Sequence, residues 1–171
     1  NMIQRKQSIY LFFAAALLCI TYFVPLSSFI GEKDSLVLYL YQVKTLVPGF
    51  SSPFTPFFIL PLLISVTLIV IISIVTIFLY KKRKLQLILV RFMLLLLLIY
   101  LGVYFFYYID ILENQSGGYA SYQYSVPILE TGMEIPTVIF IIPLVSAMLL
   151  FMAARGITND EKLVRSTDRL R

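Results

Sequence analysis

The sequence predicts an all-α integral membrane protein, a bundle of four transmembrane helices with a small β element at one end. Hydrophobic residues make up 60% of the 171-residue chain, and charged residues make up only 13%. Soluble domains contain about 45–50% apolar and about 25% charged residues. Four uncharged stretches are also long enough to cross a bilayer. A soluble domain of this length would need more charged residues to cover its surface.

The positions of the spans follow from the stretches without charge. A helix that rises 1.5 Å per residue needs about 20 apolar residues to cross roughly 30 Å of hydrocarbon. We therefore expect helices at about 8–25, 57–80, 89–109 and 135–154. The first resembles a signal peptide, but no small-x-small cleavage site follows it, so we expect an uncleaved helix. All four are apolar on every side, as contact with lipid requires.

The basic residues gather on one side of the predicted membrane. Two precede the first span, five lie in the connection 81–91 and five in the tail 155–171, which is twelve of the fourteen Lys and Arg residues. By the positive-inside rule, both termini and this connection lie in the cytoplasm. The net charge of +5 therefore needs no nucleic-acid binding, and we expect none. The cluster predicted to fix topology and to contact anionic lipids is Lys81, Lys82, Arg83 and Lys84.

Two connections on the opposite side, 26–56 and 110–134, are too long for simple turns. Within them, 35–43 and 117–126 are rich in β-branched and aromatic residues and are bounded by turn residues, which is typical of strands. Because a single strand is not stable alone, we expect a small antiparallel sheet built from both connections. The alternative is a pair of irregular loops whose tyrosines lie in the membrane interface.

The predicted spans lack the side chains that most membrane chemistry requires. The chain has no His and a single Cys, Cys19, and the one charged residue within a span is Arg91, near the inner boundary of the third. Intramembrane charges mark proton relays and ion-coupled transport. We therefore predict no catalytic residue, no metal site and no cofactor. The remaining hydroxyl groups more often join helices than bind a substrate.

The tail has the pattern of a short amphipathic helix over 159–171. Thr158-Asn-Asp-Glu161 matches a capping box, with Thr158 as the N-cap and Glu161 reaching back. A helix of about 13 residues is marginal in water, so we expect it to dock on a partner or on the membrane surface. The alternatives are a frayed tail and a tail held by loops of the same chain. The predicted docking residues are Leu163, Val164, Arg165 and Leu170.

The two ends of the chain carry the most specific patterns. The segments 2–11 (MIQRKQSIYL) and 160–171 (DEKLVRSTDRLR) resemble a Bacteroidota family of small four-helix inner-membrane proteins, catalogued as a domain of unknown function. The resemblance implies a bacterial inner membrane, with the two long connections in the periplasm. It implies no activity, cofactor or catalytic residue. In that setting, Asp34-Ser35-Leu36 resembles the O-glycosylation tripeptide of Bacteroidota, with Ser35 as the acceptor.

These features favour a non-catalytic accessory subunit of a larger inner-membrane complex. Its partners would be other membrane protein subunits, and protein export or insertion machinery is the first candidate among such complexes. The alternative is a small-molecule transporter or channel, which would lack the intramembrane polar groups that bind a cargo. An intramembrane enzyme would need a nucleophile with its base, or a metal, and the side chains for these are absent.

Overall fold

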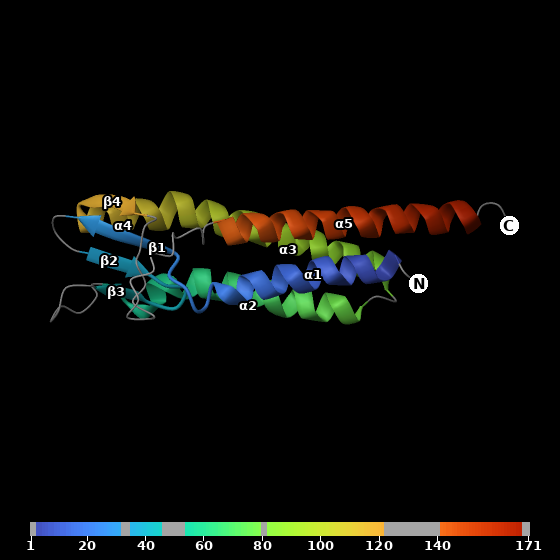
Figure 1. Ribbon diagram of the computed structural model, residues 1–171, viewed down its shortest axis with the longest axis horizontal. Coiled ribbons are helices and arrows are strands. Elements are labelled where there is room, and N and C mark those ends of the chain that lie inside the picture. Colours follow the sequence, from blue (N-terminus) through green and yellow to red (C-terminus); the bar gives the residue numbers. More distant parts are fainter. Residues whose placement is uncertain (1–2, 32–34, 46–53, 80–81, 122–140, 169–171) are drawn as a thin grey trace, which may run out of the picture.

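The computed structural model describes residues 3–31, 35–45, 54–79, 82–121 and 141–168. Four long helices form the body of the molecule (Figure 1). They are α1 (Ile3–Ile20), α2 (Pro56–Phe78), α3 (Arg83–Val103) and α5 (Ile141–Asp168).

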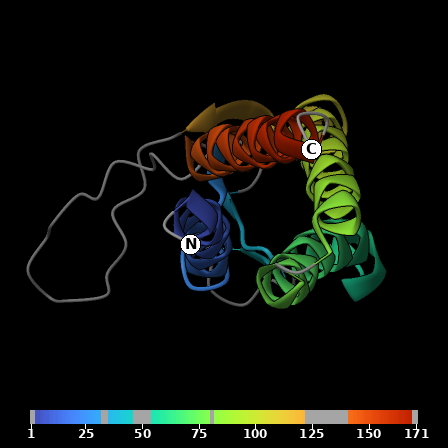
Figure 2. The same cartoon turned by 90° about the vertical axis from the view of Figure 1, so that its right-hand side faces the viewer.

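Each long helix is antiparallel to its neighbours, and the order around the bundle is α1, α5, α3 and α2 (Figure 2). The α2–α3 connection and both termini lie at one end, which we call the basic end (Figure 1). The strands lie at the other end, which we call the sheet end. Antiparallel packing of helices that follow one another in sequence is the usual arrangement of a four-helix bundle.

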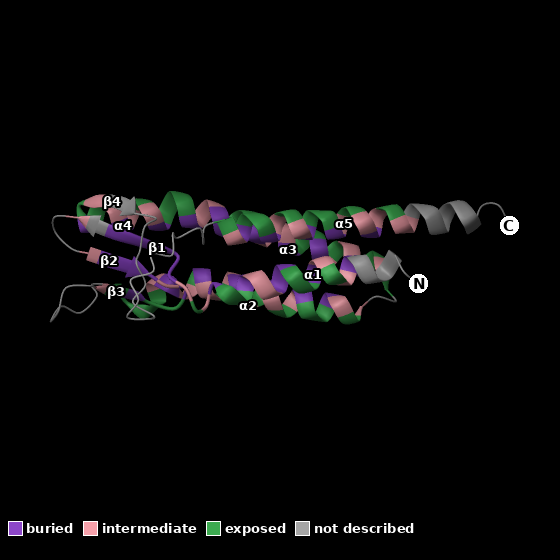
Figure 3. Ribbon diagram, in the orientation of Figure 1, coloured by how far each residue is buried: buried purple, intermediate pink, exposed green. Residues whose placement is uncertain are grey.

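Three helical stretches are long and apolar enough to cross a membrane: Pro56–Phe78, Arg83–Ser116 and Ile141–Glu161. Helix α1 contributes a shorter apolar stretch, Gln7–Ile20. The outward faces of these helices are exposed (Figure 3). Many of the exposed residues are large and apolar, and soluble proteins rarely expose so many. Phe78, for example, is 76% exposed and Phe106 is 87% exposed. Three of the four predicted spans are therefore long and apolar enough to cross a membrane, which is consistent with the predicted helical membrane protein.

A small antiparallel sheet closes the sheet end, in the strand order β3-β2-β1-β4. Its strands are β1 (Ser27–Gly31), β2 (Ser35–Leu38), β3 (Val43–Thr45) and β4 (Gly118–Ser121). Strand β4 comes from the second long connection and pairs with β1 from the first, with Phe29 opposite Ala120. The predicted sheet built from both connections is therefore confirmed, and the described strand residues do not form irregular loops. The predicted strand 35–43 is wrong as a single strand, because a turn with a hydrogen bond from Tyr39 N to Gln42 O (2.8 Å) separates β2 from β3.

The first helix ends five residues earlier than predicted. Helix α1 stops at Ile20, and hydrogen bonds from Thr21 N to Leu18 O (3.2 Å) and from Phe23 N to Ile20 O (3.0 Å) form a turn there. Pro25 has no N–H to donate, and the next residue already belongs to the sheet end, because Leu26 N donates to Leu38 O at 2.7 Å. An apolar stretch therefore does not remain helical to its last residue.

The third helix is longer than predicted. Helix α3 continues through a π-helical turn, η1 (Tyr104–Tyr108), into α4 (Ile109–Ser116), where a loop was expected from residue 110 onward. It ends at Gly117, which has φ of 68° and donates from its N–H to Glu113 O at 2.9 Å. A left-handed residue of this kind is the common end of a helix, and glycine adopts it without strain. The acidic residues beyond position 109 mark the limit of the apolar layer, but the helix continues past that limit.

Two tyrosines of η1 join the helices to the sheet end. Tyr108 OH donates to Phe58 O of α2 at 2.5 Å, and Tyr104 OH donates to Leu26 O at 3.3 Å. Both side chains are buried, whereas Phe106 between them faces outward. Buried tyrosines need such partners for their hydroxyl groups. These two hydrogen bonds hold η1 against the start of α2 and against Leu26, and so position the sheet end relative to the helices.

The most extensive helix contact is between α1 and α5. Ala14 of α1 and Ala153 of α5 have no exposed surface, so both lie in the interior of the bundle. A Cβ added to Gly156 would lie 3.2 Å from Gln7 Cγ, so α5 approaches α1 closely at this glycine. Small residues at a helix contact permit close packing of this kind.

Candidate functional site

The basic end carries five described Lys and Arg side chains, and they come from two helices and one connection. Lys82 precedes α3, Arg83 and Lys84 form its first turn, and Arg91 lies two turns further along it. Arg155 comes from α5. Lys82, Lys84, Arg91 and Arg155 are exposed, and Arg83 is half-buried. Lys81, the remaining member of the predicted cluster, lies outside the described residues.

Backbone hydrogen bonds build the connection that presents this cluster. Lys82 N donates to Leu79 O at 2.9 Å, and Gln86 N donates to Lys82 O at 3.0 Å. The Gln86 side chain is buried and its Nε2 donates to Thr76 O at 3.4 Å, which joins α3 to the last turns of α2. The charged side chains themselves are not needed for this geometry.

We expect a protein in which glutamine replaces Lys81, Lys82, Arg83 and Lys84 to fold. A larger fraction of its molecules should have inverted topology, and its binding to anionic lipids should be weaker. Each basic residue near an anionic surface contributes about 1 kcal/mol of attraction. The measurements are the fraction of molecules with inverted topology and the binding to anionic vesicles. Lys44→Gln, an exposed change at the sheet end, is the control and should alter neither. Loss of all detergent-stable protein would contradict a generic membrane role and indicate a specific partner.

The hydroxyl groups of the helices bond mainly to backbone of their own helix. Thr67 Oγ1 is 2.6 Å from Leu63 O, and Thr76 Oγ1 is 2.6 Å from Ile72 O. Between helices, Ser73 Oγ donates to Met93 Sδ at 3.1 Å. These are structural contacts of the kind predicted, and they leave little hydroxyl chemistry for a substrate.

The tail does not begin a new helix, so the predicted capping box is wrong. Helix α5 runs without interruption from Ile141 to Asp168, and Thr158 lies within it. Its Oγ1 donates to Ala154 O at 2.8 Å, one turn back, instead of capping an N-terminus. Asp160, expected near the start of the tail helix, instead accepts a hydrogen bond from Gln7 Nε2 of α1. A helix begun in the apolar layer simply continues into the polar tail.

The predicted docking residues fall in the last part of this helix. Leu163, Val164 and Arg165 belong to α5, which extends past the other helices at the basic end (Figure 1). Their side chains, and the whole of Leu170, lie outside the described residues. The predicted glycan acceptor, Ser35, is half-buried at the start of β2 and is paired with Ile30. Its glycosylation stays a prediction.

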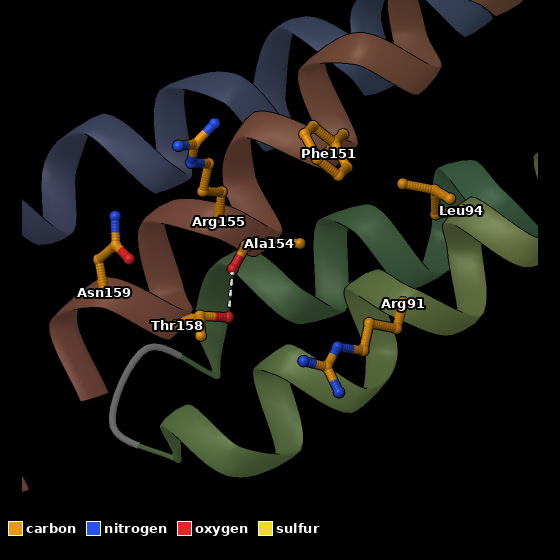
Figure 4. Close-up of a pocket in the computed structure, with 7 residues that line it drawn as sticks. All are labelled: Arg91, Leu94, Phe151, Ala154, Arg155, Thr158 and Asn159. Carbon is orange, nitrogen blue, oxygen red and sulfur yellow. Dashed lines mark hydrogen bonds between the residues drawn. The ribbon is translucent and has the colours of Figure 1, made fainter. Parts of the chain in front are cut away.

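Two open grooves flank α5 near the basic end. The larger, of about 590 Å³, lies between α3 and α5 (Figure 4). The smaller, of about 350 Å³, lies between α1 and α5. Both are lined by Phe151, Arg155 and Asn159. Sequence reasoning found neither groove, although Arg91 inside a predicted span was the available signal for the larger one.

Groups of acidic, Cys or His side chains do not converge on a metal site in the described part of the chain. Cys19 is exposed on α1. What the basic end offers chemically is therefore positive charge and hydrogen-bond donors beside an apolar surface. Such a surface can hold an anion or an amphiphile.

A family described as a domain of unknown function (DUF4293) matches residues 3–170. The chain belongs to this family. The match spans nearly the whole chain and so confirms the family type expected from the two terminal segments. The Bacteroidota lineage that the resemblance implies stays a prediction. No curated protein and no solved structure is significantly similar to this member of the DUF4293 family.

Proposed function

We propose that this member of the DUF4293 family is a non-catalytic accessory subunit of a membrane-protein complex in the bacterial inner membrane. In the proposed arrangement α1 crosses the membrane together with the three longer helices. The basic end, with both termini, lies in the cytoplasm, and the sheet end lies in the periplasm. The basic residue distribution supports this orientation, with twelve of fourteen Lys and Arg residues on the proposed cytoplasmic side.

The observation that carries the proposal is the extension of α5 beyond the bundle. The helix continues to Asp168, past the ends of the other three (Figure 1). An isolated helical extension of a few turns is marginal in water and gains stability by packing on another surface. Leu163 and Thr167, four residues apart in the sequence, fall on one side of a helix here. A partner subunit that packs against this side would stabilise the helical extension.

The interior of the bundle supports a structural role more than transport. Its buried polar side chains are neutral among the described residues, and include Gln7, Ser73, Thr76, Gln86 and Ser146. Coupled transporters use intramembrane charges for ions and protons. Among membrane complexes, protein export or insertion machinery is the one we propose to test first.

The test is co-purification of a tagged chain in a mild detergent, followed by mass spectrometry. The expected result is a stable complex that contains a defined membrane subunit. Leu163→Asp combined with Leu170→Asp should release that subunit while the tagged chain remains in the membrane. Leu163→Met combined with Leu170→Met keeps the apolar surface and should retain it. A monodisperse species of about 20 kDa without a partner, or a complex unaffected by the aspartates, would contradict the proposal.

A further inference from the structure

The groove between α3 and α5 has an unusual combination of charge and apolar surface. Arg91 and Leu94 come from α3, and Phe151, Ala154, Arg155, Thr158 and Asn159 come from α5 (Figure 4). No carboxylate lines it. Both arginines are exposed, and neither forms an ion pair within the described part of the chain. The described residues that line the groove therefore include two positive charges and no acidic side chain.

The polar and apolar residues of the groove are sorted along the bundle axis. Leu94 lies about one turn after Arg91, and Phe151 lies about one turn before Arg155. Because α3 and α5 are antiparallel, both apolar residues are on the side toward the bundle centre. Thr158 and Asn159 follow Arg155 and are on the side toward the basic end. From the basic end toward the bundle centre, the groove is thus lined first by hydrogen-bonding side chains, then by the two arginines, and then by apolar side chains.

Arg91 lies far enough along α3 from the basic end to be level with the apolar part of the bundle. It comes eight residues after Arg83, which is about 12 Å along the helix. Ser73 Oγ of α2 is 3.1 Å from Met93 Sδ of α3, so Arg91 is close in level to the last turns of α2. The exposed Phe78 ends α2 still nearer the basic end. A guanidinium at this level is costly unless its side chain extends to the interface or binds an anion.

We propose that this groove binds one anionic phospholipid. Its phosphate is bound by Arg91 and Arg155, whose guanidinium groups point apart in Figure 4 and turn toward the phosphate on binding, and one acyl chain follows Leu94 and Phe151 toward the bundle centre. Headgroup hydroxyls face Thr158 and Asn159. Basic pockets between membrane helices on the cytoplasmic side are suited to anionic headgroups, and guanidinium groups bind phosphate with two parallel hydrogen bonds. The inference rests on the proposed insertion of the chain into a membrane, but it does not depend on a partner subunit.

Because the chain contains no tryptophan, a tryptophan introduced at the groove would be the only one in the protein and could serve as a fluorescent probe. Phe151 is 58% exposed and lines the groove, so Phe151→Trp places a single indole at the proposed acyl-chain site. The purified protein is reconstituted in phosphatidylcholine bilayers and titrated with brominated phosphatidylglycerol or brominated phosphatidylcholine. Bromine quenches tryptophan only at close range. The expected result is quenching at a several-fold lower mole fraction of the glycerol lipid.

Two charge-matched variants decide whether the groove is responsible. Arg91→Gln with Arg155→Gln in the Phe151→Trp protein should lower the preference for phosphatidylglycerol on the order of tenfold. Lys33→Gln with Lys44→Gln removes the same charge from the first long connection, outside the groove, and should preserve the preference. Equal quenching by both lipids, or equal loss in the two variants, would overturn the proposal. Competition by inorganic phosphate would also overturn it, because it would indicate a site for free anions.

If the double arginine variant fails to insert, the lipid preference of the Phe151→Trp protein with its arginines intact still tests the proposal. A second variant, Arg91→Lys with Arg155→Lys, keeps both charges but loses the planar guanidinium groups. It should show a reduced yet measurable preference. Loss of a co-purifying subunit would not alter any of these readouts, so failure of the proposed function can be distinguished from failure of the lipid site.

Discussion

Gly31→Ala is expected to destabilise the sheet end by about 3 kcal/mol, the upper end of the range for overpacked sites. A Cβ at this position would lie 2.6 Å from Gly118 N and 2.7 Å from Ser116 C, with Ser116 O closer still. All three atoms belong to the backbone that turns from α4 into β4, so no side chain can move aside. Relief of the clash would require β1 and β4 to separate, and Gly31 is paired with Gly118.

The measurement is thermal unfolding of the purified protein in detergent, with Gly102→Ala as the matched control. A Cβ at Gly102, in α3, would meet no atom within 4 Å. Because alanine favours the helix over glycine by roughly 0.5–1 kcal/mol, this control should unfold at the same or a slightly higher temperature. If Gly31→Ala is as stable as Gly102→Ala, the close approach of β1 to the end of α4 is not as described.

Gly156→Leu should have the second largest effect, a loss of about 1–3 kcal/mol from overpacking between α1 and α5. A Cβ at position 156 would be 3.2 Å from Gln7 Cγ, which is tight but meets only a flexible side chain. A leucine adds three more carbons toward α1. It would displace Gln7 and break its hydrogen bond to Asp160.

Gly156→Ala separates this effect from the simple loss of a glycine. A small shift of the Gln7 side chain accommodates one methyl group, and alanine strengthens the helix, so this variant should stay close to the parent in thermal unfolding. Gln7→Ala with Gly156→Leu provides a second comparison, because shortening the opposing side chain should recover part of the loss. Equal stability of the leucine and alanine variants would show that α1 and α5 do not meet here.

The main features of the fold could be predicted from the sequence because they depend on local pattern. Uncharged stretches located the long helices, and β-branched and aromatic residues between turn residues located the sheet end. The limits of the elements could not be predicted in the same way. The end of the apolar layer was taken as the end of the helix, but the helical stretch that begins with α3 continues through η1 and α4 to Ser116, and α5 continues to Asp168. A helix needs no apolar residues to continue once its backbone hydrogen bonds propagate.

Non-local contacts account for what was missed. The pairing of Ser28 with Ser121 joins residues far apart in sequence, and β1 itself lay at the end of an apolar stretch without the signals of a strand. The capping-box pattern at Thr158 also fits a helix interior, where threonine donates to the carbonyl one turn back. The α3–α5 groove exists because these two helices are neighbours in the bundle. Their arrangement places Arg91 and Arg155 in the lining of the same groove.

The claim that the chain crosses the membrane four times, α1 included, is tested most directly by labelling single cysteines. In a Cys19→Ser background, Gln42→Cys and Gln115→Cys probe the sheet end, where both residues are exposed. Gln4→Cys and Ser166→Cys probe the two termini. A membrane-impermeant maleimide added to right-side-out vesicles should label the first pair at once and the second pair only after permeabilisation. Labelling of Gln4→Cys from outside would contradict the crossing by α1, and the fully reversed pattern would contradict the orientation.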